Sequence, residues 1–108
     1  MTKVKAKDAN DWQKWHYGIM ESRDVLRCDG KSIPVAPRTV CESTGLTCKG
    51  LEVYENDWLE IVGNGEKYRF LVMRGENGFY AAEDEEYKYF LQEIVNDATC
   101  CIIGNIYD

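Results

Sequence analysis

The feature that most constrains this fold is the glycine, asparagine and aspartate punctuation that recurs every few residues. It appears at Asp29-Gly30, Gly63-Asn64-Gly65, Gly75-Glu76-Asn77-Gly78 and Gly104-Asn105, among other places. Glycine and asparagine tolerate the positive φ angles that tight turns need. The runs between them are short and rich in β-branched and aromatic residues, which is typical of strands. The pattern therefore predicts a mainly β protein, either a meander or a small barrel.

The strands can be placed from these runs. We expect them at residues 15–20, 25–27, 32–35, 39–42, 51–54, 58–62, 66–74, 79–82 and 99–103. Residues 28–31 would join two of them as a hairpin. Pro34 and Pro37 have no amide hydrogen to donate, so their segment should lie at a sheet edge or leave the sheet. Residues 43–46 are expected to form a turn.

Residues 83–97 break the strand pattern. Tyr87, Phe90, Leu91, Ile94 and Val95 recur at helical intervals after the acidic residues 83–86. Acidic residues in a first turn complement the helix dipole. We predict one short helix near residues 84–96, and an irregular strand is the alternative.

Length and cysteine usage bound the class of protein. A chain of 108 residues fits one domain, and no apolar run approaches the roughly 20 residues of a membrane helix. The basic first residues are not followed by an apolar stretch, so no signal peptide is expected. Five cysteines are an odd number and include no C-x₂-C pair, which favours a reduced, cytoplasmic protein without a metal site or other cofactor.

Charge is distributed unevenly along the chain. Residues 1–50 carry a net charge of +3 and residues 51–108 a net charge of −9. Nucleic-acid binding needs a basic face that releases counterions. Only the first half could supply such a face. The charge distribution therefore argues against nucleic acid as a partner but does not exclude it. The acidic run 83–86 is either a solvated helix start or a mimic of phosphate groups.

Two sets of polar residues are candidates for catalytic groups. Glu55 and Asp57 flank Asn56, and acid–base work would require one carboxyl in an apolar pocket. Asn56 instead suits a tight turn, which Asp57 would brace through backbone hydrogen bonds. His16 has no nucleophile motif beside it and is interpreted as structural. The sequence predicts no catalytic residue.

Four landmarks in order resemble the YopX-like family of phage and prophage proteins. The segment TGLTCKGLEVYENDWLEI (residues 44–61) is similar to the family's Thr-Gly-Leu, glycine turn and Tyr/Phe-Glu-Gly-Asp step. WHYG (15–18), VAPRTVCESTGL (35–46) and IIGNIYD (102–108) are similar to its other landmarks. Asn56 replaces the usual glycine, and the loop after Leu46 is about one residue shorter.

The resemblance implies a single YopX-like domain over residues 1–108. It would consist of an N-terminal β segment (1–46) and a small SH3-type barrel (47–108). Its turn motif would include Gly45, Gly50, Glu55, Asn56, Asp57, Gly104 and Asn105. The resemblance implies no chemistry, and it implies a bacterial host cytoplasm as the location.

The aromatic residues exceed what one small barrel can bury. SH3-type barrels often present an aromatic groove, and packing in the core or in a subunit interface is the alternative. The predicted interaction surface consists of Trp15, Tyr17, Tyr54, Trp58 and Tyr80.

We therefore expect a non-enzymatic phage or prophage accessory protein that acts as an interaction module. Its partner would be a host protein, and a homo-oligomer is also expected. The alternative is a small nucleic-acid-binding barrel that uses basic residues of the first half, namely Lys3, Lys5, Lys7, Lys14, Arg23 and Arg27.

Overall fold

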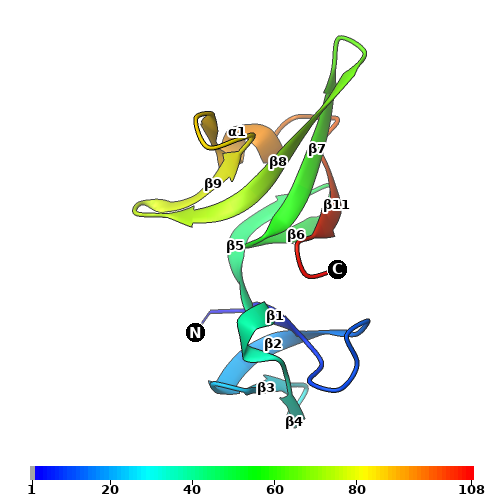
Figure 1. The fold of residues 1–108 in the computed structure, drawn as a ribbon, viewed down its shortest axis with the longest axis vertical. Helices are drawn as coiled ribbons and strands as arrows, with labels where there is room; N and C mark the ends of the chain where they lie inside the picture. The colour runs from blue at the N-terminus through cyan, green and yellow to red at the C-terminus, as the bar shows by residue number, and fades with distance from the viewer. Residues whose placement is uncertain (1) are drawn as a thin grey trace. The chain divides into compact units, whose positions relative to one another are not determined.

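The computed structural model describes residues 2–108, which form two compact units (Figure 1). The first unit holds the residues through Ser43 together with Tyr107 and Asp108, and the second runs from Thr44 to Ile106. Strand accounts for 60% of the structure and helix for 7%, so the mainly β prediction is confirmed. The two units divide three residues before the position inferred from the sequence.

The first unit is an antiparallel arrangement of short strands. Its elements are β1 (Val4–Lys7), β2 (Trp15–Ser22), β3 (Val25–Cys28), β4 (Lys31–Pro34), the 3₁₀ helix η1 (Pro37–Thr39) and the start of β5 (Cys41–Cys48). The strand order is β4-β3-β2-β1-β5. β4 is the edge strand and Pro37 opens η1, as expected of residues that cannot donate a ladder hydrogen bond.

The predicted hairpin between β3 and β4 is confirmed. Asp29 and Gly30 have φ angles of 51° and 78°. Two successive positive φ angles define the turn whose twist matches that of paired strands.

The core of the first unit is small and is built around β1. Val4, Ala6, Leu26 and Val35 are buried together. The Thr39 hydroxyl accepts the Lys7 N–H at 2.8 Å and donates to the Ala36 carbonyl at 2.7 Å. β1 was missed from the sequence, because two of its four residues are lysines.

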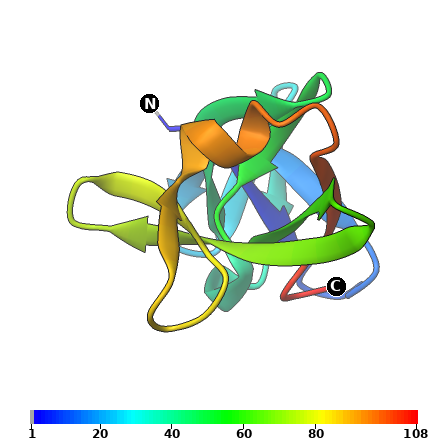
Figure 2. The ribbon, with the colours of Figure 1, turned by 90° about the horizontal axis from the view of Figure 1, so that it is seen from above.

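The second unit contains most of the regular structure. After β5 come β6 (Leu51–Tyr54), β7 (Asp57–Gly63), β8 (Glu66–Gly75), β9 (Gly78–Ala82), β10 (Lys88–Phe90), α1 (Leu91–Val95) and β11 (Cys101–Asn105). An antiparallel sheet has the order β10-β9-β8-β7-β11, with β10 and β11 at its edges. α1 follows β10 directly, and the chain then leads on to β11 (Figure 2). The strands expected at 51–54, 58–62, 66–74 and 79–82 lie where the sequence placed them, within one residue.

One face of this sheet forms the core of the second unit. Leu59, Phe70, Val72 and Ala81 are buried on it, and the Phe70 ring meets Tyr89 edge-on at 5.5 Å. The same cluster takes in residues outside the sheet: Cys48, Val53, Leu91, Ile94, Val95 and Cys100. The β5–β6 hairpin and α1 thus bury their apolar side chains with this face of the sheet.

The prediction of a turn at residues 43–46 is wrong, since β5 runs through these residues. Gly45 has a φ of 78° within the strand. The Thr44 hydroxyl donates to the Val53 carbonyl at 2.7 Å, so this segment is held to β6. The chain reverses later, at Lys49 and Gly50, whose φ angles are 52° and 80°.

The helix predicted near residues 84–96 is present only as α1, which is five residues long. The acidic residues 83–86 lie outside it, because the Asp84 side chain accepts the N–H groups of Glu86 and Tyr87 at 2.8 and 2.9 Å. Aspartate that bonds nearby amides in this way competes with helix formation. The alternative prediction, an irregular strand in this segment, corresponds to the short strand β10. Within residues 2–108 no helix has the length and hydrophobicity to cross a membrane.

Candidate interaction surface

The sheet of the second unit carries apolar side chains on both faces. Trp58 of β7 lies opposite Leu71 of β8, which lies opposite Ala82 of β9, and Ala82 lies opposite Lys88 of β10. Partners in register share a face, and this row lies on the face away from Leu59 and the core. An antiparallel sheet normally places polar side chains on its solvent side. This outer face therefore requires an explanation.

A second row extends the same face. Met73 lies opposite Tyr80, which lies opposite Phe90. Met73 is 37% exposed, Trp58 36% and Phe90 77%. We call the group formed by Trp58, Leu71, Met73, Tyr80 and Ala82 the outer apolar face. Of these five residues, Trp58 and Met73 are exposed. Exposed apolar side chains that lie together mark interaction sites more often than scattered ones do.

The outer apolar face is hollowed into a cleft of about 340 Å³. Its five residues supply the apolar lining, and Glu83, Asp84, Glu85 and Lys88 supply the polar lining. The volume lies in the range of small ligand and peptide side-chain pockets. The cleft thus combines aromatic and aliphatic walls with carboxylates from one loop.

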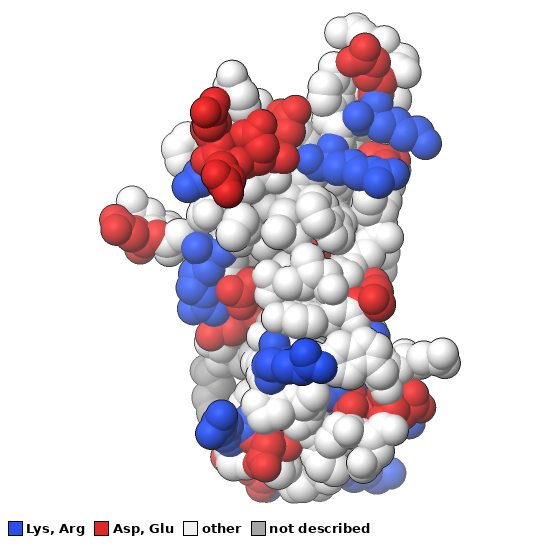
Figure 3. Space-filling view, in the orientation of Figure 1, with Lys and Arg blue, Asp and Glu red and all other residues white. Residues whose placement is uncertain are grey.

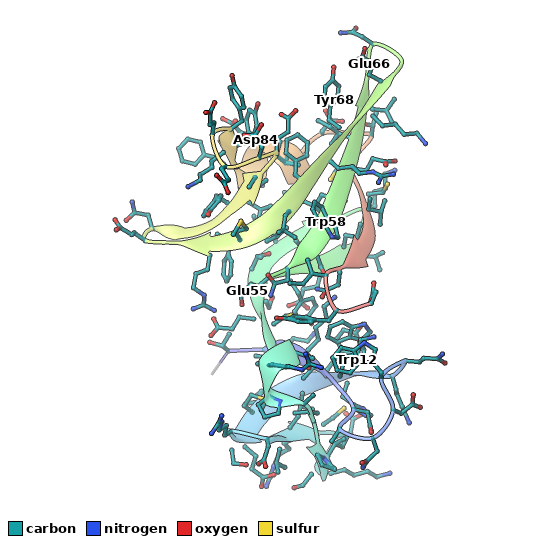
Figure 4. The ribbon with its side chains drawn as sticks, viewed as in Figure 1. Trp12, Glu55, Trp58, Glu66, Tyr68 and Asp84 are labelled. Atoms are coloured by element: carbon teal, nitrogen blue, oxygen red, sulfur yellow. The ribbon has the colours of Figure 1, made fainter. Side chains whose placement is uncertain are left out.

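The acidic loop (residues 83–86) is held in a defined shape beside the cleft. Asp84 closes it by accepting two backbone N–H groups, and the Glu83 N–H donates to the Tyr87 carbonyl at 3.0 Å. Acidic side chains gather over this loop, and uncharged side chains cover the adjacent part of the sheet (Figure 3). Asp84 projects from the loop and Trp58 lies on β7 (Figure 4).

The cleft already contains one cation on an aromatic face. Lys88 Nζ lies 5.1 Å from the centroid of the Tyr80 ring, and the Tyr80 hydroxyl donates to the Met73 sulfur at 3.7 Å. On the core side of β10, the Tyr89 hydroxyl donates to Glu83 at 3.3 Å. Burial, followed by the Glu83 charge, raises the pKa of Tyr89. Glu83 therefore acts on Tyr89, on the face of β10 opposite Lys88.

The structure divides the five residues of the predicted interaction surface. Trp58 and Tyr80 line the same cleft. Tyr54 is only 3% exposed, so the prediction that it belongs to an interaction surface is wrong. Trp15 and Tyr17 lie on β2 in the first unit. The sequence could not separate these residues, because exposure depends on which strand neighbours cover each ring.

The turn at residues 55–57 has the structure that the sequence predicts. Asn56 has a φ of 70°, between β6 and β7. Asp57 is 1% exposed; it accepts the Tyr54 N–H at 2.8 Å and the Asn105 side-chain amide at 2.9 Å. Glu55 pairs with Arg74 at 3.5 Å. Both carboxylates of the candidate catalytic pair are thus engaged in structural contacts.

The remaining turn residues occupy three different settings. Gly50 belongs to the reversal between β5 and β6, and Gly104 has a φ of 158° beside a register shift between β11 and β7. Asn105 also donates to the Glu55 carbonyl at 3.4 Å. Asn105 therefore connects β11 to the turn that precedes β7.

His16 has a partner that the sequence did not indicate. Its Nε2 lies 2.8 Å from Asp8 Oδ2, and the other Asp8 oxygen accepts the N–H groups of Asn10 and Asp11. The hydrogen bond from His16 and these amides lower the pKa of Asp8. The pairing depends on β1–β2 register, in which Ala6 lies opposite His16, and no local motif encodes it.

The five cysteines are free thiols. The Cys48 thiol donates to the Cys100 carbonyl at 3.1 Å, and burial raises the pKa of Cys100 to about 12. Across residues 2–108 no three histidine, cysteine, aspartate or glutamate side chains are grouped to hold a metal ion. The described cysteines thus behave as small buried or half-buried hydrophobic groups.

Four residues of the cleft were not predicted from the sequence to belong to a site: Leu71, Met73, Ala82 and Lys88. A signal for the first two is present, since Leu71-Val72-Met73 is apolar at consecutive positions of one strand. Successive residues point to opposite faces, so this run requires that both faces carry apolar side chains. Lys88 has no comparable signal.

No protein-family model, curated protein or solved structure matches this chain, and the resemblance to the YopX-like family stays a prediction.

Proposed function

We propose that this chain is a non-enzymatic interaction module that binds a segment of another protein on the outer apolar face. The observation that carries this proposal is the cleft in which Trp58, Met73 and Tyr80 lie beside the acidic loop. The ligand would be an extended peptide segment with apolar residues next to a lysine or arginine. Its apolar side chains would cover the exposed rings, and its cation would face the loop.

Charge complementarity argues for a basic ligand. Glu83, Asp84 and Glu85 contribute three carboxylates to one edge of the cleft, and Lys88 is the single cation among its lining residues. Aromatic faces attract cations, and nearby carboxylates strengthen that attraction at a partly desolvated site. Opposite charge across an interface also raises the association rate and excludes acidic partners.

The alternative, nucleic-acid binding through the basic residues of the first half, is less well supported. Lys5 and Lys7 are only 7% and 3% exposed. Lys3, Lys14, Arg23 and Arg27 are exposed, but Arg27 is paired with Glu21 at 2.7 Å. Phosphate contacts require cations that reach the surface.

The family, the detailed fold and the location belong to the same proposal. Four ordered sequence landmarks support membership in the YopX-like family of phage and prophage proteins. A single core that joins the five-stranded sheet with the β5–β6 hairpin supports an SH3-type arrangement of the second unit. Five free thiols support the reducing cytoplasm of a bacterial host, where the ligand would be a host protein.

The test is selection of binders from a random peptide library, followed by affinity measurements on synthetic copies of the enriched peptides. The enriched peptides should carry lysine or arginine beside apolar residues. Trp58→Ala should weaken binding by about tenfold or more, because central aromatic anchors dominate such interfaces. Tyr17→Ala is the matched control, since Tyr17 is an exposed aromatic residue of the other unit.

The charge requirement is tested separately. Glu83→Gln combined with Glu85→Gln should weaken binding of the basic peptides and reduce the dependence of affinity on salt concentration. Peptides that bind equally well to wild type and to Trp58→Ala would rule out the outer apolar face as the site. If the protein is folded and the selection enriches no peptide, the outer apolar face is likewise ruled out as the site.

A further inference from the structure

The first unit contains a ladder of alternating cations and tryptophan rings. Lys5 Nζ and Lys7 Nζ each lie 4.6 Å from the centroid of the Trp15 ring. Lys7 Nζ is also 5.9 Å from the Trp12 ring, and Arg38 Cζ is 4.9 Å from that ring. We call these five residues the lysine–tryptophan ladder.

The ladder is built by rigid elements rather than by a loop alone. Lys5 and Lys7 alternate with Val4 and Ala6 on β1, and Trp15 lies opposite Lys7 on β2. Trp12 lies between these strands in sequence, and Arg38 belongs to η1. Trp12 is labelled in Figure 4. The positions of the two lysines and Trp15 are therefore fixed by strand register.

A carboxylate is bound at this ladder. Asp108 Oδ1 accepts the Trp15 indole N–H at 2.9 Å, and the same oxygen lies 3.8 Å from Lys7 Nζ. The Lys7 side chain is 4% exposed and that of Asp108 is 50% exposed. A nearly buried ammonium group loses hydration, and a carboxylate together with a tryptophan face offsets that loss. The arrangement has the composition of a receptor site with its ligand in place.

The ligand segment lies outside the strands and helices, whereas the site that holds it does not. Tyr107 and Asp108 belong to no strand or helix, whereas Lys7 and Trp15 are paired strand residues. Withdrawing two residues would leave the backbone hydrogen bonds between β1 and β2 intact. A segment outside the regular structure can be exchanged for an equivalent segment without breaking a strand pairing.

We propose that Trp15 and Lys7 form a recognition site for an aspartate-bearing peptide segment, of which Tyr107–Asp108 is the internal ligand. A second segment with the same chemistry would bind when this one is withdrawn. The indole N–H selects an acceptor oxygen, and the lysine selects a charged one. The site differs in location and in ligand charge from the cleft beside Trp58, so the two proposals stand independently.

The experiment uses the chain with Trp58→Phe, so that tryptophan emission reports Trp12 and Trp15. In one variant the chain stops at Ile106, and in a second, full-length variant Tyr107 and Asp108 are both replaced by alanine. The probe is the acetylated, amidated peptide Asn-Ile-Tyr-Asp, which copies residues 105–108. The control peptide is Asn-Ile-Tyr-Asn, which keeps the shape and removes the charge.

Both variants should bind the aspartate peptide, and the asparagine peptide should bind about tenfold or more weakly, because hydrogen bonds to charged groups are the stronger ones. The chain that retains Tyr107 and Asp108 should bind about tenfold or more weakly than either variant, because its internal ligand competes at high effective concentration. Lys7→Met should abolish the preference for aspartate, and Lys31→Met, at an exposed lysine of the same unit, should not.

Equal affinity for the two peptides would overturn the proposal. If neither variant binds the aspartate peptide although the circular dichroism spectra of both match that of the parent chain, the proposal is also overturned. Tight binding to the parent chain would show that the peptide uses some other surface.

Discussion

Asp57 and Asn105 join the start of β7 to the end of β11 through a buried hydrogen bond of 2.9 Å. The two residues are 48 positions apart in the sequence. Asp57 also accepts the Tyr54 N–H, so one carboxylate braces a tight turn and a long-range strand pairing together. An aspartate that resembles half of a catalytic pair in the sequence is a structural residue in the fold.

Asp57→Ala should lower the free energy of unfolding by about 2–4 kcal/mol, because it leaves the Tyr54 N–H and the Asn105 amide without this acceptor in a buried setting. Denaturant melts measure the change. Glu55→Ala is the control: its partly exposed pair with Arg74 should contribute about 1 kcal/mol or less. Equal losses for the two variants would contradict the assigned role of Asp57.

Asn56→Gly should be neutral or stabilising by about a few tenths of a kcal/mol, because glycine adopts the observed φ of 70° without steric strain. Asn56→Ala should instead destabilise by about 1 kcal/mol, since a β-carbon is strained in the left-handed region. Denaturant melts of both variants give the comparison. A loss above about 1 kcal/mol in the glycine variant would show that the Asn56 side chain contributes to stability.

Stability should fall as pH rises above about 9. Burial raises the pKa of Cys100 from 9.0 to about 12 in the folded chain, so in this range the unfolded chain releases a proton that the folded chain retains. The contribution is complete below pH 9 and is lost progressively between pH 9 and 12. Denaturant melts at several alkaline pH values should show a steeper decline for wild type than for Cys100→Ala. Parallel curves would contradict this assignment.

Reductants and zinc chelators should leave the melting temperature unchanged, because Cys41, Cys48 and Cys100 are buried free thiols. Thermal melts with and without each reagent measure this directly. A structural metal would couple its binding energy to folding, so a large drop in melting temperature on adding a chelator would reveal one.

The chain should self-associate through its exposed aromatic residues. Phe90 is 77% exposed on β10, which is an edge strand with unpaired backbone groups on one side. A net charge of −6 opposes association only weakly at physiological salt, since screening acts beyond about 8 Å. Light scattering over a wide concentration range should give a mass above that of one chain.

Phe90→Lys should shift that mass toward the monomer, and Val62→Lys, a similarly placed charge on the exposed side of β7, should not. A monomeric mass for wild type at every concentration would end the oligomer prediction. It would also assign the aromatic rings of β9 and β10 that are not fully buried to ligand binding alone.

Local chemistry explains why much of the sheet could be predicted. Asp29-Gly30 and Asn64-Gly65 both adopt two successive positive φ angles, and few residue pairs do so without strain. Such turns fix the register of the strands on each side. Lys49-Gly50 forms the same kind of turn, but lysine is not a residue that indicates it.

Tertiary contacts explain what could not be predicted. Lys5 and Lys7 are strand residues because Trp15 and Trp12 cover their ammonium groups, and nothing near them in sequence reveals this. In the candidate site, Trp58 and Tyr80 were identified from composition. Their association with Met73 and the acidic loop required the register of four strands.

The strand order also determines when the second unit can close during synthesis. β7 to β10 pair with their neighbours in sequence, whereas β11 must return to β7 across the whole intervening chain. Local pairs form before distant ones because their loops cost less entropy to close. Until residues 101–105 emerge from the ribosome, β7 is an open edge, and a nascent chain stopped before that point presents it to chaperones and to other unfinished chains.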